Sequence, residues 1–237
     1  MKKTVLILGA SSDIGIALTE KFLKKNYYVN AHCNKNSKDL KNLKKKFKNL
    51  KVYKFDLSNV ESLDKQVKKN DFFKKIDIFI SLSGYLSFAT IKNFKIKEFN
   101  RHLNVNYLSS IIVLRQIINH MVKKNWGRIL LSSSIGTKFG GANNTYIYSV
   151  TKYLNEFFPK YLKEITKFNI LSNTLQIGVT NTKLLHKDKN KNLKKRVKLI
   201  PLNRMANVNE VTKKIYFLTS SENTLITGQV LNISGGE

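Results

Sequence analysis

The sequence contains few of the residues that characterise secreted, metal-binding or membrane-spanning proteins. Only one of its 237 residues, Cys33, is a cysteine, so no disulfide can form within the chain and a reducing compartment is expected. The four histidines show no metal-ligand spacing, and no metal site is predicted. No apolar run is long enough to span a membrane, and the apolar N-terminal segment is too short for a signal peptide. We therefore expect a cytoplasmic protein without a membrane partner.

Proline, glycine and acidic residues are also scarce. Two prolines and eleven glycines leave no low-complexity linker, which predicts a single domain over residues 1–237. Only 15 Asp and Glu oppose 43 Lys and Arg, giving a formal net charge of +28. The lysines are spread along the chain and no nucleic-acid-binding motif is present, so no nucleic-acid partner is expected. The charge should still attract anionic substrates and cofactors at low salt.

Hydrophobic residues make up 42% of the chain, and apolar runs alternate with helical patterns along its length. Strands are predicted at residues 5–8, 28–31, 52–55, 76–82, 128–132, 169–176 and 229–233. Helices are predicted at residues 14–25, 37–47, from 58, 105–123, 148–166 and 209–218, with a kink at Pro159. This alternation predicts an α/β fold, a single-domain Rossmann-type doubly wound parallel sheet of about seven strands with helices on both faces.

Three side chains near the middle of the chain could donate a proton to a substrate. Tyr148 and Lys152 are four residues apart and share one helix face, and Ser134 follows an apolar run upstream. A neighbouring ammonium should lower the pKa of the phenol, and the serine hydroxyl can hydrogen-bond a substrate oxygen. This combination suits protonation of a carbonyl during hydride transfer, or the reverse reaction. In so lysine-rich a chain the spacing alone is weak evidence, and an exposed lysine beside a packed tyrosine is the alternative.

A glycine pair joins the first predicted strand to the first helix. Gly9 and Gly15 allow a tight turn and the close approach of a pyrophosphate to the helix N-terminus, although a plain strand-to-helix turn is the alternative. Asp13 lies between them, and we expect it to cap the helix and face away from phosphate. No acidic residue lies between Lys21 and Lys38, where NAD enzymes place an acid, which favours NADP(H) over NAD(H).

Ordered motifs along the whole chain resemble the short-chain dehydrogenase/reductase family, most closely the 3-oxoacyl-(acyl carrier protein) reductases. Besides the residues above, the matching stretches are Asp56-Leu57, Ser83-Gly84, Asn106 in Asn-Val-Asn-Tyr, Gly127-Arg-Ile, Ile177-Gly178 with Thr182, Pro201-Leu-Asn-Arg204, Ile226-Thr-Gly-Gln229 and Gly235-Gly236. The resemblance implies an NADP(H)-dependent oxidoreductase that reduces a carbonyl to an alcohol.

The resemblance also implies roles for individual residues. Tyr148 is the expected general acid, and Lys152 is expected to lower its pKa and to hold the nicotinamide ribose. Ser134 is expected to orient the substrate carbonyl. Asn106 is expected to support a proton-relay water. Ser133 is the alternative serine, because the spacing to Tyr148 differs by one residue from the family's. The implied cofactor-binding residues are Gly9, Ser11, Ser12, Asp13, Ile14, Gly15, Asn34, Lys35, Asp56, Leu57, Ser83, Gly84, Tyr148, Lys152, Ile177, Gly178, Thr180 and Thr182.

The chain departs from the family pattern near the expected cofactor site. Leu8 replaces a usual threonine, and Ser81-Leu82-Ser83-Gly84 replaces Asn-Asn-Ala-Gly, which suggests that two apolar positions repack against each other. The lysine-rich residues 182–199 fall where the family has its substrate lid, and could instead be a solvated loop.

The substrate is expected to be a small or carrier-bound carbonyl compound, with a 3-oxoacyl thioester as the most concrete candidate. A sugar, polysaccharide or secondary-metabolite precursor, or a non-catalytic nucleotide-binding regulatory role, are the alternatives. A homo-oligomer, either a tetramer or a dimer, is implied by the resemblance.

Overall fold

A single parallel sheet runs through the centre of the protein. The computed structural model describes residues 2–35, 37–187 and 192–237. Within these residues the strands lie in the order β3-β2-β1-β4-β5-β6-β7, and all neighbouring pairs are parallel. The strands are β1 (Thr4–Leu8), β2 (Tyr28–Cys33), β3 (Leu50–Lys54), β4 (Ile78–Ser81), β5 (Gly127–Ser134), β6 (Ile170–Ile177) and β7 (Val230–Ile233). The predicted doubly wound α/β fold is therefore confirmed.

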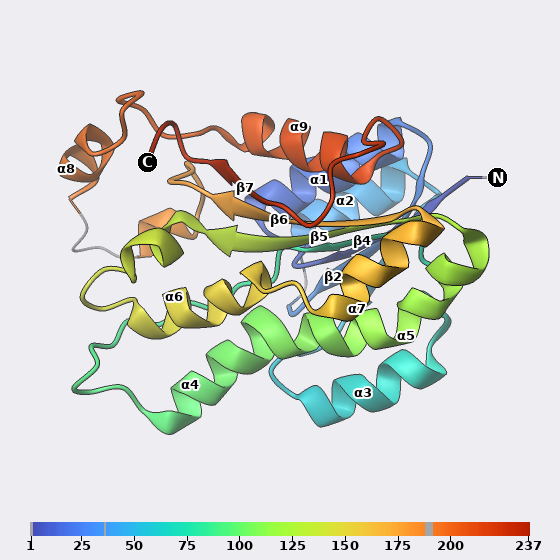
Figure 1. Ribbon diagram of the computed structural model, residues 1–237, viewed down its shortest axis with the longest axis horizontal. Helices are drawn as coiled ribbons and strands as arrows, with labels where there is room; N and C mark the ends of the chain where they lie inside the picture. Colours follow the sequence, from blue (N-terminus) through green and yellow to red (C-terminus); the bar gives the residue numbers. More distant parts are fainter. Residues whose placement is uncertain (1, 36, 188–191) are drawn as a thin grey trace.

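Helices cover both faces of the sheet (Figure 1). One layer contains α1 (Asp13–Lys24), α2 (Lys38–Lys46) and α9 (Val208–Thr219). The other contains α3 (Val60–Lys69), α4 (Ile96–Leu103), α5 (Ser109–Lys124), α6 (Tyr146–Tyr153) and α7 (Lys160–Glu164). The short helix α8 (Leu193–Lys198) lies beyond the carboxyl ends of the strands, near the C-terminus (Figure 1).

Burial on both faces explains the apolar runs of the central strands. In β1, Val5 and Ile7 pack into one core cluster with α1 and α9, whereas Leu6 and Leu8 pack into a second cluster with α3 and α5. All four side chains are fully buried. A central parallel strand has no solvent-facing side, so its sequence is continuously apolar rather than alternating.

The segment around the predicted catalytic helix differs from the prediction. We expected one helix over residues 148–166 with a kink at Pro159, but α6 ends at Tyr153 and a 3₁₀ turn follows from Leu154 to Glu156. Pro159 is instead the N-cap of α7, with extended backbone (ψ 151°). Proline lacks the amide hydrogen of a continuing helix and disfavours helical backbone in the preceding residue, so it interrupts the helix rather than bending it.

A further difference lies before α5. Helix α4 was not predicted, and the turn of π-helix over Asn104–Leu108 joins it to α5, so the predicted helix at residues 105–123 is the continuation of an earlier one. Asn106 sits inside this π-turn and is fully buried. Single π-turns often occur at functional sites because they redirect one side chain out of the helical register.

Polar contacts stabilise the end of the sheet at which the strands begin. Buried Asp77, just before β4, accepts hydrogen bonds from the Thr4 amide (2.8 Å) and from Lys124 Nζ (2.5 Å) of α5. Buried Arg128 of β5 donates to the backbone carbonyls of Gly127, Asn169 and Asn223 and has no acidic partner among the described residues. Burial lowers the pKa of this guanidinium to about 10. These contacts lie away from the carboxyl ends of the strands and serve the fold.

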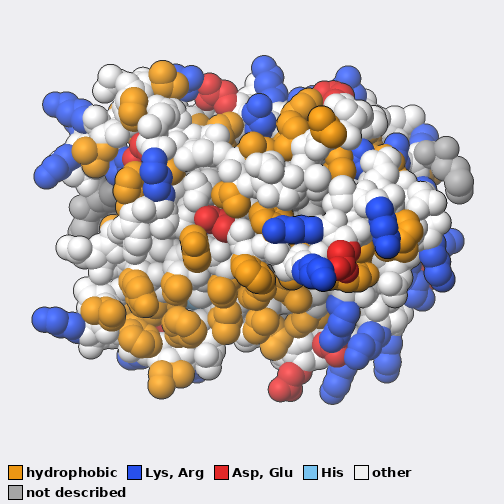
Figure 2. All heavy atoms as spheres, in the orientation of Figure 1, with side chains coloured by type: hydrophobic (Ala, Val, Ile, Leu, Met, Phe, Trp, Pro, Cys, Tyr) orange, Lys and Arg blue, Asp and Glu red, His pale blue; other side chains and the backbone are white. Residues whose placement is uncertain are grey.

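Hydrophobic side chains gather on the face of the protein that α4, α6 and the start of α5 present (Figure 2). Tyr153, Phe157 and Tyr161 are half or more exposed along α6 and α7.

No helix within the described residues is both long enough and apolar enough to cross a membrane.

Candidate active site

At two positions in the turn between β1 and α1 there is no room for a side chain. Gly9 has φ +73°, and a Cβ there would lie 2.8 Å from the backbone oxygen of Leu82. A Cβ on Gly15 would lie 2.5 Å from the Gly9 oxygen. Ser12 caps α1 by accepting from the Gly15 amide (3.1 Å) and donates to the Gly9 carbonyl (2.9 Å). The turn therefore brings backbone close to the helix N-terminus, where an anion such as a pyrophosphate is favoured.

A cavity of about 1190 Å³ opens at the carboxyl ends of the strands, next to this turn. Its size is ample for a dinucleotide and a substrate side by side. Most of the predicted cofactor residues line it, namely Gly9, Ser11, Ser12, Asp13, Ile14, Asn34, Asp56, Leu57, Ser83, Gly84, Tyr148, Lys152, Ile177, Gly178, Thr180 and Thr182. The side-chain-free turn and this lining fit a bound dinucleotide.

Three of the predicted site residues do not line the cavity. Gly15 lies behind the turn, Lys35 is exposed beside it, and Asn106 is buried beneath it. The expectation that Asp13 caps the helix was wrong, because Ser12 is the N-cap, and Asp13 is among the residues that line the cavity. Asp13 accepts a hydrogen bond from the backbone amide of Lys183 (2.7 Å) instead.

Tyr148, Ser134 and Lys152 come together at this cavity. Ser134 ends β5, and its Oγ accepts a hydrogen bond from the Gly136 amide (3.2 Å), which leaves its own hydrogen for the Tyr148 hydroxyl. Lys152, on the next turn of α6, is 3% exposed. Its Nζ donates to the Ser83 carbonyl (3.2 Å) and to Ser132 Oγ (3.0 Å).

The pKa of Tyr148 contradicts the expectation from the sequence. Burial of the phenol raises the pKa of Tyr148 to about 12, and the hydrogen bond from Ser134 only partly offsets this rise. Burial lowers the pKa of Lys152 to about 7. The ammonium hydrogens go to Ser83 and Ser132 rather than to the phenol, so Lys152 does not offset the desolvation of a phenolate. At neutral pH Tyr148 is thus a neutral phenol, which suits a proton donor.

Asn106 links the segment after β4 to α6 by hydrogen bonds. Its Oδ1 accepts from the Tyr85 amide (2.7 Å), and its Nδ2 donates to Thr151 Oγ1 (2.9 Å), next to Lys152 on α6. Its backbone carbonyl accepts from Asn155 Nδ2 (2.9 Å). Nδ2 also donates to the Tyr85 carbonyl (3.2 Å), so both the oxygen and the nitrogen of the side chain are hydrogen-bonded within the protein.

The departures from the family pattern form a buried hydroxyl cluster rather than an apolar contact. Ser81 Oγ is 2.9 Å from Ser83 Oγ and accepts from Ser110 Oγ (2.7 Å) of α5. Leu8 packs into the cluster with α3 and α5, whereas Leu82 packs against the cluster on the other face of the sheet. The expectation that both places are apolar is therefore wrong for the strand end, where Ser81 and Ser83 are hydrogen-bonded hydroxyls.

Two site residues gave no signal in the sequence. His32 lines the cavity, and its Nδ1 accepts from the Gly9 amide (3.2 Å), so Nε2 carries the hydrogen that faces the Phe55 carbonyl (3.0 Å). Burial lowers the pKa of His32 to about 4 and keeps the ring neutral. Glu156 lies just after the catalytic helix and bonds to Ser133, the predicted alternative serine. Because Ser133 is directed to Glu156, Ser134 is the serine that meets Tyr148.

The predicted lid, residues 182–199, is held at both of its described ends, while residues 188–191 lie outside the described residues. Near its start, Lys183 Nζ lies 3.5 Å from Asp13. Near its end, Arg196 of α8 pairs with Glu237 (2.5 Å). Both ends therefore contact the cavity wall.

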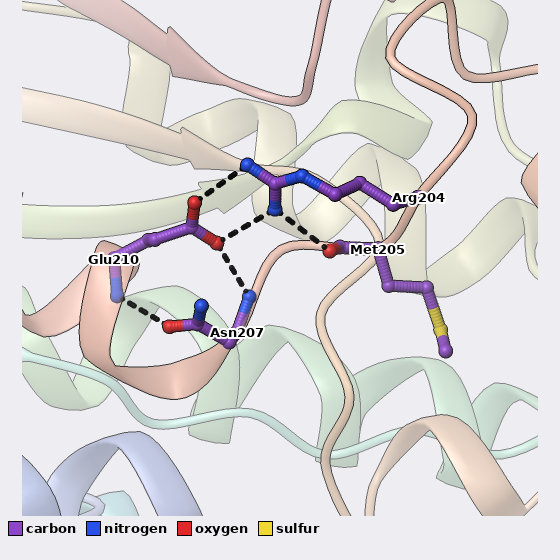
Figure 3. Close-up of polar contacts among 4 residues, drawn as sticks. All are labelled: Arg204, Met205, Asn207 and Glu210. Carbon is purple, nitrogen blue, oxygen red and sulfur yellow. Dashed lines mark hydrogen bonds and ion pairs between the residues drawn. The ribbon is translucent and has the colours of Figure 1, made fainter.

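The loop after α8 is anchored by a bidentate ion pair. Arg204 holds both carboxylate oxygens of Glu210 (2.7 and 3.0 Å), and Glu210 completes a capping box with Asn207 at the start of α9 (Figure 3). The hydrogen bonds from Arg204 and Asn207 lower the pKa of Glu210 to about 2. The adjacent Ala206 pairs with Thr180 of the cavity wall, so this clamp fixes the rim of the cavity.

Comparisons with known proteins agree with this geometry. Residues 9–237 match the family model described as enoyl-(acyl carrier protein) reductase. A curated relative, the 3-oxoacyl-[acyl-carrier-protein] reductase FabG of Buchnera aphidicola subsp. Baizongia pistaciae, is 28% identical over 99% of this chain and 97% of its own.

Solved structures give the same result. The structure of ElxO with NADP bound is 27% identical, with a TM-score of 0.84 over 99% of this chain and 98% of its own. A 3-oxoacyl-[acyl-carrier protein] reductase from Brucella melitensis shares the fold, with a TM-score of 0.87 at 22% identity over 99% of this chain and 90% of its own. The match of the family model over nearly the whole chain, on a fold and cavity of this kind, makes the protein an oxidoreductase that belongs to the short-chain dehydrogenase/reductase family.

Proposed function

We propose that this protein reduces a 3-oxoacyl thioester to the 3-hydroxyacyl thioester, with NADPH as the reductant. The observation that carries the proposal is that Tyr148, Ser134 and Lys152 line the same cavity as the glycine turn at Gly9. The similarity to 3-oxoacyl-[acyl-carrier-protein] reductases over almost the whole chain supports the substrate class. Apolar side chains support it too, since Leu86, Phe88, Phe139, Leu184, Leu185 and Leu199 line the cavity and suit an acyl chain.

In the proposed reaction, NADPH supplies the hydride that adds to the carbonyl carbon. Tyr148 donates its proton to the carbonyl oxygen as negative charge develops there, so the product is an alcohol. A solvent proton restores the phenol. When the substrate is bound, the Ser134 hydroxyl turns its hydrogen from Tyr148 to the same carbonyl oxygen and orients that oxygen toward the phenol. Because Tyr148 is protonated at neutral pH, it can donate the proton that reduction requires.

We assign supporting roles to two further residues. Lys152 holds the nicotinamide ribose, since its Nζ lies in the cavity wall beside the Ser83 carbonyl. Asn106 holds α6 through Thr151, and we place the relay of protons to the site beside its backbone carbonyl.

The preference for NADP(H) rests on the end of β2. Asn34 lines the cavity there and Lys35 is exposed beside it, so both can reach a ribose phosphate. ElxO, which is 27% identical and similar in fold, holds NADP, and a variant of the same protein holds NADPH. We expect NADPH to bind more tightly than NADH, and the reverse order would contradict this assignment.

A substrate screen that follows NADPH absorbance tests the function. The expected result is oxidation of NADPH with acetoacetyl-CoA and with acetoacetyl-N-acetylcysteamine. Turnover only with sugar carbonyl compounds would replace the thioester with the alternative substrate class. Binding of NADPH without turnover of any carbonyl compound would refute the catalytic proposal.

The exposed apolar face over α6 and α7 supports assembly with further copies of this chain. Tyr153, Phe157 and Tyr161 are 59%, 70% and 50% exposed, an unusual arrangement for a surface left in water. We propose a dimer or tetramer built on this face, in a cytoplasmic enzyme. Light scattering should show Phe157→Lys as a smaller species, whereas the matched control Leu225→Lys, at an 85% exposed site elsewhere, should keep the native mass. A monomeric native protein would refute the assembly.

A further inference from the structure

Glu156 gathers three hydrogen-bond donors on a single carboxylate oxygen. It ends the 3₁₀ turn that replaces the expected continuation of α6, and it is half-buried. Its Oε1 accepts from Ser133 Oγ, from Thr137 Oγ1 (2.7 Å) and from Gln176 Nε2 (3.0 Å). These donors come from β5, from the 3₁₀ turn that follows it, and from β6. One side chain thus joins three segments behind the cavity.

The donors are also bonded to one another. Ser133 and Gln176 are register partners on the parallel strands β5 and β6. Gln176 Nε2 donates to Thr137 Oγ1 (2.9 Å) as well as to Glu156. The Thr137 hydroxyl has one hydrogen, and two acceptors lie within reach of it, Glu156 Oε1 and the Ser134 carbonyl (2.8 Å). A network closed in this way holds its members in a single arrangement.

The residue enclosed by this network is Ser134. Ser133 precedes it, Thr137 follows it by three residues, and both bond to Glu156. The Ser134 hydroxyl in turn bonds to Tyr148, on the same helix that leads into Glu156. Glu156 itself does not line the cavity, so it reaches the reaction only through its neighbours.

We propose that Glu156 is a positioning residue that fixes the Ser134 hydroxyl against Tyr148. This inference rests on the proposed function, because it gives Ser134 the substrate oxygen to orient. A shift of about 1 Å in a positioning group can cost about a hundredfold in rate, so loss of the Glu156 acceptor should slow the reaction without weakening the cofactor site.

The test compares Glu156→Leu, which removes the acceptor, with Glu156→Gln, which keeps an oxygen at Oε1. The matched control is Glu164→Leu, because Glu164 is 54% exposed and its partner is Lys160 on the same helix. For Glu156→Leu we expect kcat to fall by about tenfold to a hundredfold while the Kd for NADPH stays within about twofold. For Glu156→Gln and Glu164→Leu we expect rates within about threefold of the native enzyme.

A double-mutant cycle with Ser134→Ala separates positioning from general support of the fold. If Glu156 acts through Ser134, adding Glu156→Leu to Ser134→Ala slows the enzyme no further. Additive losses, or equal losses of kcat and of NADPH affinity, would overturn the inference. Should Glu156→Leu fail to fold, Ser133→Ala combined with Thr137→Val removes the donors instead and has the same expected results.

The outcome is distinguishable from failure of the proposed function. The native enzyme with acetoacetyl-CoA tests the function by itself, before any variant is compared. If another carbonyl compound proves to be the substrate, the kcat of each variant relative to the native enzyme, measured with that compound, still decides the role of Glu156.

Discussion

Replacement of Lys152 by methionine should change how the stability of the protein depends on pH. The Lys152 side chain is buried, and its ammonium bonds to a backbone carbonyl and to the Ser132 hydroxyl, with no carboxylate partner among the described residues. Burial penalises the charged form and lowers the pKa from 10.5 to about 7. Methionine has a similar length and carries no charge to bury.

The direction and size of the effect follow from the two pKa values. Below pH 7 both the folded and the unfolded chain carry the ammonium, and folding bears the full cost of burying it. Between pH 7 and 10.5 the folded protein has released a proton that the unfolded chain still binds, so the free energy of unfolding rises with pH in this window. The difference between the two pKa values corresponds to an upper bound of about 5 kcal/mol.

Urea unfolding of the native protein and of Lys152→Met at several pH values measures this window. Most other lysines titrate alike in both proteins, so the difference between the two free energies isolates Lys152. We expect the native protein to gain stability relative to Lys152→Met as the pH rises above 7, and the exposed-site control Lys160→Met to show no such change. A constant difference between the native protein and Lys152→Met across the window would refute the reasoning.

Three further predictions concern single polar side chains. Ser132→Ala removes an acceptor of the Lys152 ammonium and should lower the pKa of Lys152 further. The limb of the rate–pH profile that depends on this lysine should then move to lower pH. The control Ser172→Ala, at a buried hydroxyl away from the site, should leave that limb unchanged. Asp77→Asn removes the charge of a buried carboxylate that pairs with the partly exposed Lys124, and should reduce the free energy of unfolding by about 1 to 3 kcal/mol in urea. The depressed pKa of Glu210 gives stability that is present above the usual glutamate pKa and is lost as the pH falls toward about 2, so Glu210→Gln should remove that acid dependence.

Each of these predictions has a contrary result. An unmoved pH profile in Ser132→Ala would show that this hydroxyl does not set the Lys152 pKa. Asp71→Asn, at a carboxylate with 84% exposure, should leave stability unchanged, and an equal loss in both aspartate variants would contradict the assignment to the buried pair. If the stability of Glu210→Gln falls in acid just as that of the native protein does, the contact between Glu210 and Arg204 contributes nothing measurable to the free energy of unfolding.

The parallel sheet and the helices on both of its faces could be predicted from the sequence because local patterns of apolar residues indicate them. The continuous apolar run of β1 reflects burial on both faces, and the glycines at 9 and 15 mark the turn that follows. The end of α6 could be predicted only in part. Pro159 signals an interruption, but it lies six residues beyond Tyr153, the last residue of the helix, and so does not show where the 3₁₀ turn begins.

The electrostatics of the site could not be predicted, since they depend on contacts between distant segments. The sequence places Lys152 next to Tyr148, and only the fold shows that its hydrogens go to Ser83 and Ser132. Glu156 was missed for the same reason, because its partners on β5 and β6 lie about twenty residues away in the chain. A residue's neighbours in space, rather than its spacing along the chain, decide these properties.

The central claim is that the phenol of Tyr148 delivers the proton to the substrate oxygen. Tyr148→Phe removes that proton and leaves the ring in place. In a steady-state assay with acetoacetyl-CoA we expect kcat to fall by about a hundredfold to ten-thousandfold, while NADPH titration gives a nearly unchanged Kd. Turnover of Tyr148→Phe at close to the native rate, with NADPH bound as before, would contradict the account.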